Sequence, residues 1–233
     1  SLLNERLEAY RAAGGIVVIA EHDVSRIALS NTKSLPLAEQ PTSQSVARNP
    51  VLVGHDLLID FAGQRIFQGE LISLLGPNGI GKTTMLKAIY QQASKQKVPV
   101  RFVPERVEDF FIGQTLREEF ELSDKLSKSK LGLTRTTFES LITLDESDLE
   151  IHPRDLSAGM KLVLALSIAI ALKPQLLLID EPVKGLDANA RANMAEVLSC
   201  VQETGCAVVF ATHDKQFAGR ANRSIELERQ VAR

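Results

Sequence analysis

Tryptophan is absent from this 233-residue chain, and cysteine, tyrosine and methionine are scarce. The two cysteines, Cys200 and Cys206, are too few for a disulfide-stabilised scaffold and lack the spacing of a metal site. We interpret them as buried free thiols of a reducing compartment. Because 44% of the residues are hydrophobic, the chain can bury a sizeable core, which predicts one full domain with extensions.

An excess of charge of either sign is also absent. Lys and Arg total 27 against 29 Asp and Glu, so the net charge of -2 offers no overall attraction to nucleic acid or acidic lipid. We therefore expect no nucleic-acid partner, and we expect any membrane role to go through a protein partner. The longest apolar run, residues 162–172, is too short to cross a bilayer. No signal-peptide pattern occurs at Ser1, and the missing initial Met indicates a processed start or a partial sequence.

What the chain does contain is a complete phosphate-binding loop. Residues 76–83 read Gly-Pro-Asn-Gly-Ile-Gly-Lys-Thr and fit the pattern G-x-x-x-x-G-K-T. Residues 70–75 are apolar enough for a buried strand, and residues 84–90 have helical spacing. Such a junction presents free backbone N–H groups and the positive end of the helix dipole to an anion. The alternative, a chance glycine-rich turn, does not explain the strand and helix on its two sides.

Residue size and charge predict the roles within this loop. Gly76, Gly79 and Gly81 allow close backbone approach and positive φ. Lys82 brings a positive charge to the β- and γ-phosphates, and the Thr83 hydroxyl can ligate Mg²⁺. We expect the nucleoside triphosphate to lie along Gly76, Pro77, Asn78, Gly79, Ile80, Gly81, Lys82, Thr83 and Thr84.

A second apolar strand, predicted at residues 175–179, runs into two adjacent acids. Asp180 lies at the predicted strand tip, where it can hold Mg²⁺ through the water shell of the ion. Glu181 follows directly and can orient or deprotonate the water that attacks the γ-phosphate. Such a pair is usually a solvated turn when it stands alone. Together with the phosphate loop upstream, it indicates a hydrolytic site.

Two distant segments of the chain are alike. Residues 14–23 and 205–214 are identical at six of ten positions and share a final His-Asp. Their separation of 191 residues is about the size of a nucleotide-binding domain, which favours a tandem duplication over two unrelated strands. We therefore predict that residues 1–37 end a preceding domain, that residues 38–50 are a linker, and that residues 51–233 form a second domain.

The order of the motifs carries a family resemblance. Ser157, in Leu-Ser-Ala-Gly-Met, caps a predicted helix. The phosphate loop, Leu-Ser-x-Gly, the strand ending in Asp-Glu-Pro, Gly-Leu-Asp at 185–187 and Thr-His-Asp at 212–214 follow one another along the chain. In this order residues 51–225 resemble the ATPase domain of ATP-binding cassette (ABC) proteins, and residues 1–37 resemble its final third. The resemblance implies an α/β P-loop NTPase fold, with a mixed central sheet flanked by helices and a helical subdomain at about 115–172.

The resemblance also implies that two such domains pair head to tail around ATP. Ser157 and Gly159 would then contact the ATP held by the partner's phosphate loop, and Asp187 would communicate across the interface. His213 would contact the γ-phosphate as a switch. The predicted catalytic residues are Lys82, Glu181 and His213. The partner would be a tandem neighbour or a second copy.

Several positions depart from the family pattern. Glu105 stands where the family usually has Gln, and its carboxylate could approach the metal beside Thr83 and Asp180. Ala158 and Met160 replace Gly and Gln of the signature. No aromatic residue lies at positions 44–50 to stack on adenine. We interpret the nearby Phe61 and Phe67 as core residues.

Within the family, the tandem arrangement and the stretches 104–111, 115–119 and 184–187 are similar to the second half of a duplicated energy-coupling-factor ATPase. That group energises uptake of vitamins and of cobalt or nickel ions. The implied function is ATP and Mg²⁺ binding with hydrolysis that powers integral membrane transport subunits from the cytoplasmic face. Two alternatives stay open: a regulatory module with slow turnover, and a soluble cassette ATPase acting on ribosomes or DNA. No residue names the transported substrate.

Overall fold

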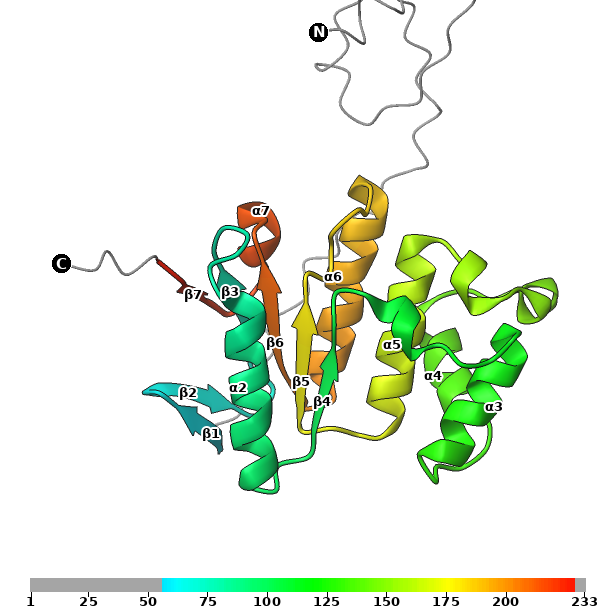
Figure 1. Cartoon of the computed structure of the whole chain (residues 1–233), viewed down its shortest axis with the longest axis horizontal. Coiled ribbons are helices and arrows are strands. Elements are labelled where there is room, and N and C mark those ends of the chain that lie inside the picture. The colour runs from blue at the N-terminus through cyan, green and yellow to red at the C-terminus, as the bar shows by residue number, and fades with distance from the viewer. Residues whose placement is uncertain (1–55, 229–233) are drawn as a thin grey trace, which may run out of the picture. The chain divides into compact units, whose positions relative to one another are not determined.

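The computed structural model describes residues 56–228 (Figure 1). The chain divides into two compact units, Ser1–Val46 and Ala47–Arg233, and every described residue belongs to the second. The fragment predicted at residues 1–37 and the linker predicted at residues 38–50 lie outside the described residues. Within residues 56–228, no helix has both the length and the apolar character needed to span a membrane.

A five-stranded parallel sheet forms the centre of the described domain. Its strands lie in the order β4-β5-β6-β3-β7, and each neighbouring pair runs parallel. They are β3 (Leu71–Leu75), β4 (Val100–Val103), β5 (Leu176–Asp180), β6 (Ala207–Thr212) and β7 (Arg223–Glu226). Every residue of β3, β5 and β6 is buried, as expected for apolar strands covered on both faces.

The apolar runs in the sequence predict four of these strands. Strands expected at residues 70–75, 98–103, 175–179 and 207–211 are confirmed as β3, β4, β5 and β6, with small shifts at their ends. The sequence reasoning missed β7, because its four residues alternate between intermediate and exposed positions and carry no apolar run.

A separate hairpin supplies the antiparallel part of the expected mixed sheet. β1 (Leu57–Phe61) pairs with β2 (Gln64–Phe67) across a two-residue turn at Ala62 and Gly63, whose φ angles are 50° and 79°. Positive φ at both turn positions matches the twist of a tight hairpin. Because β1 and β2 form a sheet of their own, the central sheet is parallel throughout residues 56–228, which corrects the placement of the antiparallel strands.

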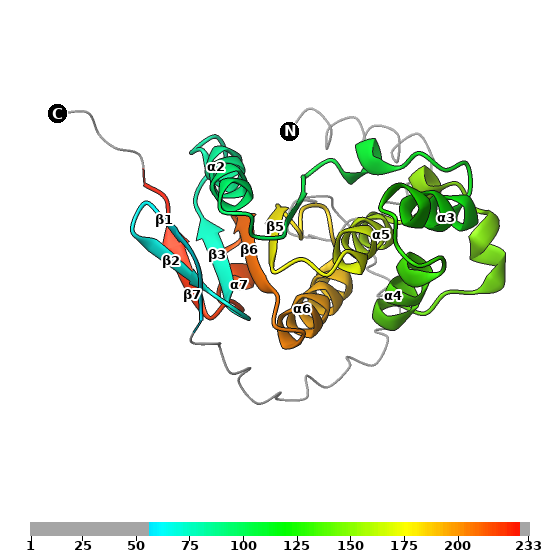
Figure 2. The same ribbon diagram turned by 90° about the horizontal axis from the view of Figure 1, so that it is seen from below.

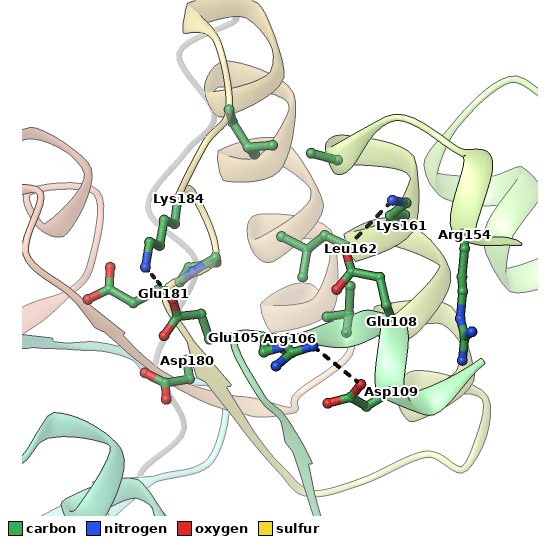
Figure 3. Close-up of a pocket in the computed structure, with 14 residues that line it drawn as sticks. Glu105, Arg106, Glu108, Asp109, Arg154, Lys161, Leu162, Asp180, Glu181 and Lys184 are labelled. Carbon is green, nitrogen blue, oxygen red and sulfur yellow. Dashed lines mark hydrogen bonds and ion pairs between the residues drawn. The ribbon is translucent and has the colours of Figure 1, made fainter.

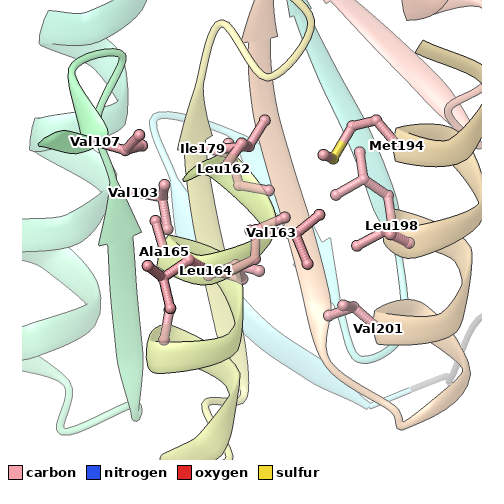
Figure 4. Packing of buried hydrophobic residues seen from close by; sticks show 14 of the residues in the cluster. Val103, Val107, Leu162, Val163, Leu164, Ala165, Ile179, Met194, Leu198 and Val201 are labelled. Atoms are coloured by element: carbon pink, nitrogen blue, oxygen red, sulfur yellow. The ribbon is translucent and has the colours of Figure 1, made fainter. Parts of the chain in front are cut away.

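Alternation along the strands separates the core into two layers. Leu177 and Ile179 of β5 face one cluster of buried side chains, and Leu176 and Leu178 face the other. On one face of the sheet, α2 (Lys82–Lys95) and the hairpin complete a cluster. On the opposite face lie α5 (Ala158–Ala171), α6 (Ala188–Glu203) and α7 (Lys215–Ala218) (Figure 2). Figure 4 shows buried side chains of this cluster from β4, β5, α5 and α6, among them Val103, Ile179, Val163 and Leu198.

The segment between β4 and β5 is mainly helical and covers the region predicted as a helical subdomain. It holds a 3-10 turn (Val107–Phe110), α3 (Leu116–Leu126), α4 (Leu133–Leu141), 3-10 turns at Glu146–Glu150 and Pro153–Asp155, and α5. Phe120 of α3 and Phe138 of α4 pack with ring centroids 5.5 Å apart. The buried Asp124 carboxylate accepts hydrogen bonds from the backbone N–H groups of Gly132 and Thr134, which joins the ends of α3 and α4.

The aromatic pair gives a test of this packing. We expect Phe138→Ala to lower the free energy of unfolding by about 3–5 kcal/mol, because a large buried ring leaves a cavity. Phe138 is 0% exposed, whereas Leu126 on the neighbouring helix is 71% exposed. Leu126→Ala is therefore the matched control, with an expected change below about 0.5 kcal/mol. Urea denaturation followed by circular dichroism measures both, and equal losses would contradict the packing.

Candidate functional site

The phosphate loop lies between β3 and α2, as the sequence predicts. Gly79 and Gly81 have φ angles of 79° and 105°, a region that L side chains rarely adopt. A Cβ at Gly76 would lie 3.0 Å from Ile80 Cγ2 and 3.1 Å from the carbonyl oxygen of Leu227. The loop therefore needs glycine for two separate reasons, conformation and close approach.

Lys82, the first residue of α2, is buried and held by several acceptors. Its Nζ donates to the carbonyl oxygens of Gly76 at 2.8 Å and Pro77 at 3.3 Å. The same Nζ lies 3.1 Å from Oε1 of Glu181, whose side chain is also buried. A buried ammonium group needs such partners, because desolvation of an unpaired charge is costly. Lys82 and Glu181, predicted to act on the same phosphate, are thus in direct contact.

Thr83 and Asp180 form a second contact between α2 and the end of β5. The Thr83 hydroxyl donates to Asp180 Oδ2 at 2.6 Å. Burial raises the pKa of Asp180, and the negative charges of Glu181 and Glu105 add to this, while the hydrogen bond from Thr83 opposes it. Both groups offer oxygen atoms, the ligands that Mg²⁺ prefers, and such sites commonly use few protein ligands beside substrate phosphates. Within residues 56–228, no three His, Cys, Asp or Glu side chains cluster as a metal site by themselves.

Glu181 and His213 meet because β5 and β6 are in parallel register. Asp180 pairs with Ala211 in the sheet, and the Glu181 N–H donates to the Ala211 carbonyl oxygen at 2.9 Å. The residues just beyond the two strand ends are therefore neighbours, and His213 Nδ1 lies 2.9 Å from Glu181 Oε2. Glu181 has a φ of 52°, a left-handed conformation that costs a non-glycine residue about 1–2 kcal/mol. Such strain is often found at functional sites.

Glu105 is paired with a lysine to which the sequence analysis gave no role at the site. The Lys184 ammonium group donates to Glu105 Oε1 in an ion pair. This hydrogen bond, together with the nearby negative charges of Glu105, Glu181 and Asp180, raises the pKa of Lys184. Within the described part of the chain, Glu105 is thus engaged by Lys184, whereas Thr83 and Asp180, its expected companions around a metal, bond to each other. In the sequence, Lys184 stands out only as the first residue of the stretch 184–187, three residues after a predicted catalytic glutamate, and neither observation points to Glu105.

A depression of about 600 Å³ opens beside these acids. Glu105, Asp180, Glu181 and Lys184 gather at one side of it (Figure 3). Charged side chains from the helical segment line the other side: Glu108, Asp109, Arg154 and Lys161. The depression therefore lies between the predicted hydrolytic residues and the helical segment.

A second depression, of about 590 Å³, brings together the three residues predicted to face a partner. Ser157, Gly159 and Asp187 all line it, and the phosphate-loop residues do not. Ser157 caps α5 by accepting the Met160 N–H at 3.2 Å, and Asp187 caps α6 by accepting the Ala190 N–H at 2.8 Å. Asp180 and Glu181 thus line the first depression, whereas Ser157, Gly159 and Asp187 line the second.

The aromatic residues near the loop behave as expected from the sequence. Phe61 is partly buried and packs against the core cluster that contains Leu86 and Ile89 of α2. Phe67 is also partly buried, at the end of β2. The structure brings Lys82, Thr83, Asp180 and Glu181 together, as the predicted phosphate site requires, while the counter-ion of Glu105 could be found only from the tertiary structure.

Comparison with known proteins agrees with the family resemblance seen in the sequence. The family described as ABC transporter matches residues 62–184. A putative ABC transporter ATP-binding protein of Streptomyces coelicolor is 33% identical over 178 residues, covering 68% of this chain and 31% of that protein. An Fe(3+) ions import ATP-binding protein of Fusobacterium nucleatum is 32% identical over 185 residues, covering 71% and 50%. The chain thus spans half or less of the length of these curated relatives.

A solved structure supports the fold. CbiO1 of Clostridium perfringens, described as part of an ABC transporter complex, superposes with a TM-score of 0.60 at 18% sequence identity, covering 76% of this chain and 83% of that one. At this identity the likeness concerns the fold alone. The family match, in contrast, covers more than half of the sequence. We conclude that the chain belongs to the ABC transporter family and contains an ATP-binding cassette ATPase domain.

Proposed function

We propose that this domain binds and hydrolyses ATP to power transport across a membrane, as the ATP-binding part of an importer. The carrying observation is the direct contact chain from Lys82 through Glu181 to His213, beside the Thr83–Asp180 pair. These side chains come from the carboxyl ends of β5 and β6 and from the first turn of α2. Ligands of α/β proteins commonly bind at this edge of a parallel sheet.

Nucleotide binding follows from the loop geometry and charge. The backbone N–H groups at the start of α2 and the Lys82 ammonium group favour an anion at this position. Thr83 and Asp180 would hold Mg²⁺, which would neutralise part of the phosphate charge. Since Lys82 pairs with Glu181 in the structure, a triphosphate competes with Glu181 for the same ammonium group. Binding of ATP would therefore loosen the contact that occupies the base.

Hydrolysis then requires a base and a way to aim it. Glu181 would accept a proton from water while the water oxygen attacks the γ-phosphorus and the bond to the β-phosphate oxygen breaks, releasing ADP. His213 holds Glu181 Oε2 through Nδ1 and so restricts the orientation of the carboxylate. The burial of Glu181 strengthens both contacts, because screening by water is weak there.

The second depression supports pairing of two cassettes. Ser157 and Gly159 lie at the start of α5, where backbone N–H groups favour an anion, and they line a depression that contains neither Asp180 nor Glu181. We infer that they act on the ATP of a second cassette, either a tandem neighbour or a second copy. Asp187 lines the same depression and would contribute to that interface.

The transport role is supported by the names of relatives. One is an ATP-binding protein for import of Fe(3+) ions, and one structural neighbour is part of a transporter complex. We propose that integral membrane subunits dock on the helical segment and the depression beside Glu105, at the cytoplasmic face of the membrane. An energy-coupling-factor type of importer stays a prediction from the sequence resemblance.

A slow regulatory module is the second candidate. It is favoured by the engagement of Glu181 with Lys82 and of Glu105 with Lys184, because both carboxylates are neutralised in the structure. Steady-state phosphate release from the purified chain separates the two functions. Robust turnover would exclude the regulatory module.

Replacement of the proposed base tests hydrolysis. Glu181→Gln should reduce phosphate release at least about 100-fold, because general-base catalysis contributes about 10² to 10⁴ in rate. ATP binding, measured with a fluorescent analogue, should persist. The matched control is Glu121→Gln, an exposed glutamate on α3 that pairs with Lys125. Unchanged turnover in Glu181→Gln would remove Glu181 from the mechanism.

Replacement of the loop lysine tests nucleotide binding. We expect Lys82→Ala to weaken binding of the ATP analogue at least about tenfold, since a partly buried charge-assisted contact is worth roughly 1.5–3 kcal/mol. Lys95→Ala, at the other end of α2 and about 20 Å away at about 1.5 Å per residue, is the control. Thermal unfolding is recorded alongside, because Lys82→Ala leaves Glu181 without its ammonium partner. Equal affinity in both variants would contradict the phosphate-site assignment.

Pairing of cassettes has its own test in the Glu181→Gln background, where ATP is retained. We expect ATP to produce a dimer in size-exclusion chromatography with light scattering. Adding Gly159→Asp should abolish the dimer but leave ATP binding intact, because it places a carboxylate where the partner's phosphates would lie. A Cβ at Gly159 meets only Ala190 Cβ at 3.8 Å, so Gly159→Ala is a tolerated control. A dimer that survives Gly159→Asp would exclude this surface.

A further inference from the structure

Three carboxylates lie near the ends of two adjacent strands. Val103 of β4 pairs with Ile179 of β5, so Glu105 and Glu181 each follow two residues beyond a matched pair. With Asp180 they line the same depression (Figure 3). Glu105 is close enough to Asp180 to contribute to its raised pKa. Like charges at this spacing repel, and the site therefore needs cations.

Each of the three acids has its own partner. Lys82 contacts Glu181, and the Thr83 hydroxyl contacts Asp180. Among the described residues, Lys184 is the one cation in ion-pair contact with Glu105. Two other cations in the depression form ion pairs within the helical segment, Lys161 with Glu108 and Arg106 with Asp109.

The backbone turn after β5 places Lys184 beside the acids. The turn after β5 is closed by a hydrogen bond from the Lys184 N–H to the Glu181 carbonyl oxygen at 3.2 Å. Pro182 and Val183 within this turn are buried, and Gly185 follows with a φ of 75°. The turn that orients Glu181 thus also directs Lys184 across to the neighbouring strand end.

Folding stability does not explain this ion pair. The Lys184 and Glu105 side chains are 55% and 42% exposed, and pairs of that exposure contribute little to stability. Their effect is instead local, because Glu105 would be a third oxygen ligand next to the Thr83–Asp180 pair if it were free to turn there.

We propose that Lys184 is a positioning residue that holds the Glu105 carboxylate away from the metal-binding end of the nucleotide site. The inference rests on the proposed binding of ATP with Mg²⁺. While Lys184 holds Glu105, only Thr83 and Asp180 offer oxygen ligands to the ion. Without Lys184, Glu105 becomes a third. Loss of Lys184 releases Glu105, and the released carboxylate strengthens Mg²⁺ binding.

The test is a double-substitution cycle on the Mg²⁺ dependence of ATP-analogue binding. The proteins are the unaltered chain, Lys184→Gln, Glu105→Gln and the double variant. Lys184→Gln should lower the Mg²⁺ concentration for half-maximal analogue binding about fivefold, the size expected of one added charge–oxygen contact of about 1 kcal/mol. In the Glu105→Gln background the same substitution should shift it less than about twofold, because no carboxylate is released.

Controls separate a positioning role from simple loss of charge. Lys184→Arg keeps the ion pair and should retain the original Mg²⁺ dependence, and Lys95→Ala should have no effect. All variants should have the same free energy of unfolding in urea, because an exposed ion pair contributes little to stability. If Lys184→Gln causes an equal shift with and without the Glu105→Gln substitution, or no shift in either case, the proposal is overturned.

The outcome also distinguishes this inference from the function on which it rests. If the unaltered chain binds and hydrolyses ATP but the four proteins show no coupling, only the role of Lys184 falls. If the unaltered chain binds no ATP analogue at all, the proposed function falls and the inference falls with it.

Discussion

The parallel register of β3, β5 and β6 is the constraint on which the site depends. These strands are buried on both faces, so their alternating side chains must satisfy one apolar cluster on each side of the sheet. A slip of one residue would exchange the two sets of side chains. The same register aligns the strand ends, which brings Asp180, Glu181 and His213 next to the first turn of α2. Core packing and site geometry therefore have one physical cause.

Electrostatics adds a second requirement at that edge. The side chains of Lys82 and Glu181 are almost fully buried, and each contacts an opposite charge or a hydrogen-bonding group. None of the buried side-chain polar atoms in residues 56–228 lacks a partner. Pairing of this kind prevents the cost of isolated buried charge. Because Lys82 is already paired with Glu181, a bound triphosphate would have to replace an existing contact of Lys82.

The two depressions are lined by different predicted site residues. Lys82 and Thr83 contact acids that line the first depression, whereas Ser157, Gly159 and Asp187 line the second. In the proposed pairing, a second cassette would supply Ser157 and Gly159 to the ATP held by this chain, and the chain's membership of the ABC transporter family supports that proposal. The helical segment between them connects both depressions through α5, since Ala158 and Gly159 line one each. The start of α5 therefore contributes to both depressions.

The sequence alone determined the local elements. Apolar runs identified four of the strands, glycine spacing identified the phosphate loop, and the acids after an apolar strand identified Asp180 and Glu181, because each pattern lies within a short stretch of chain. The order of these motifs was enough to indicate the family. Short strands with half-exposed residues, such as β7 and the hairpin, carried too little periodicity to be located.

Only the tertiary structure decided which distant side chains meet. The Glu105–Lys184 pair joins residues 79 positions apart, and no local pattern relates them. Their contact follows from the pairing of β4 with β5 and from the turn after Glu181, both of which depend on long-range packing.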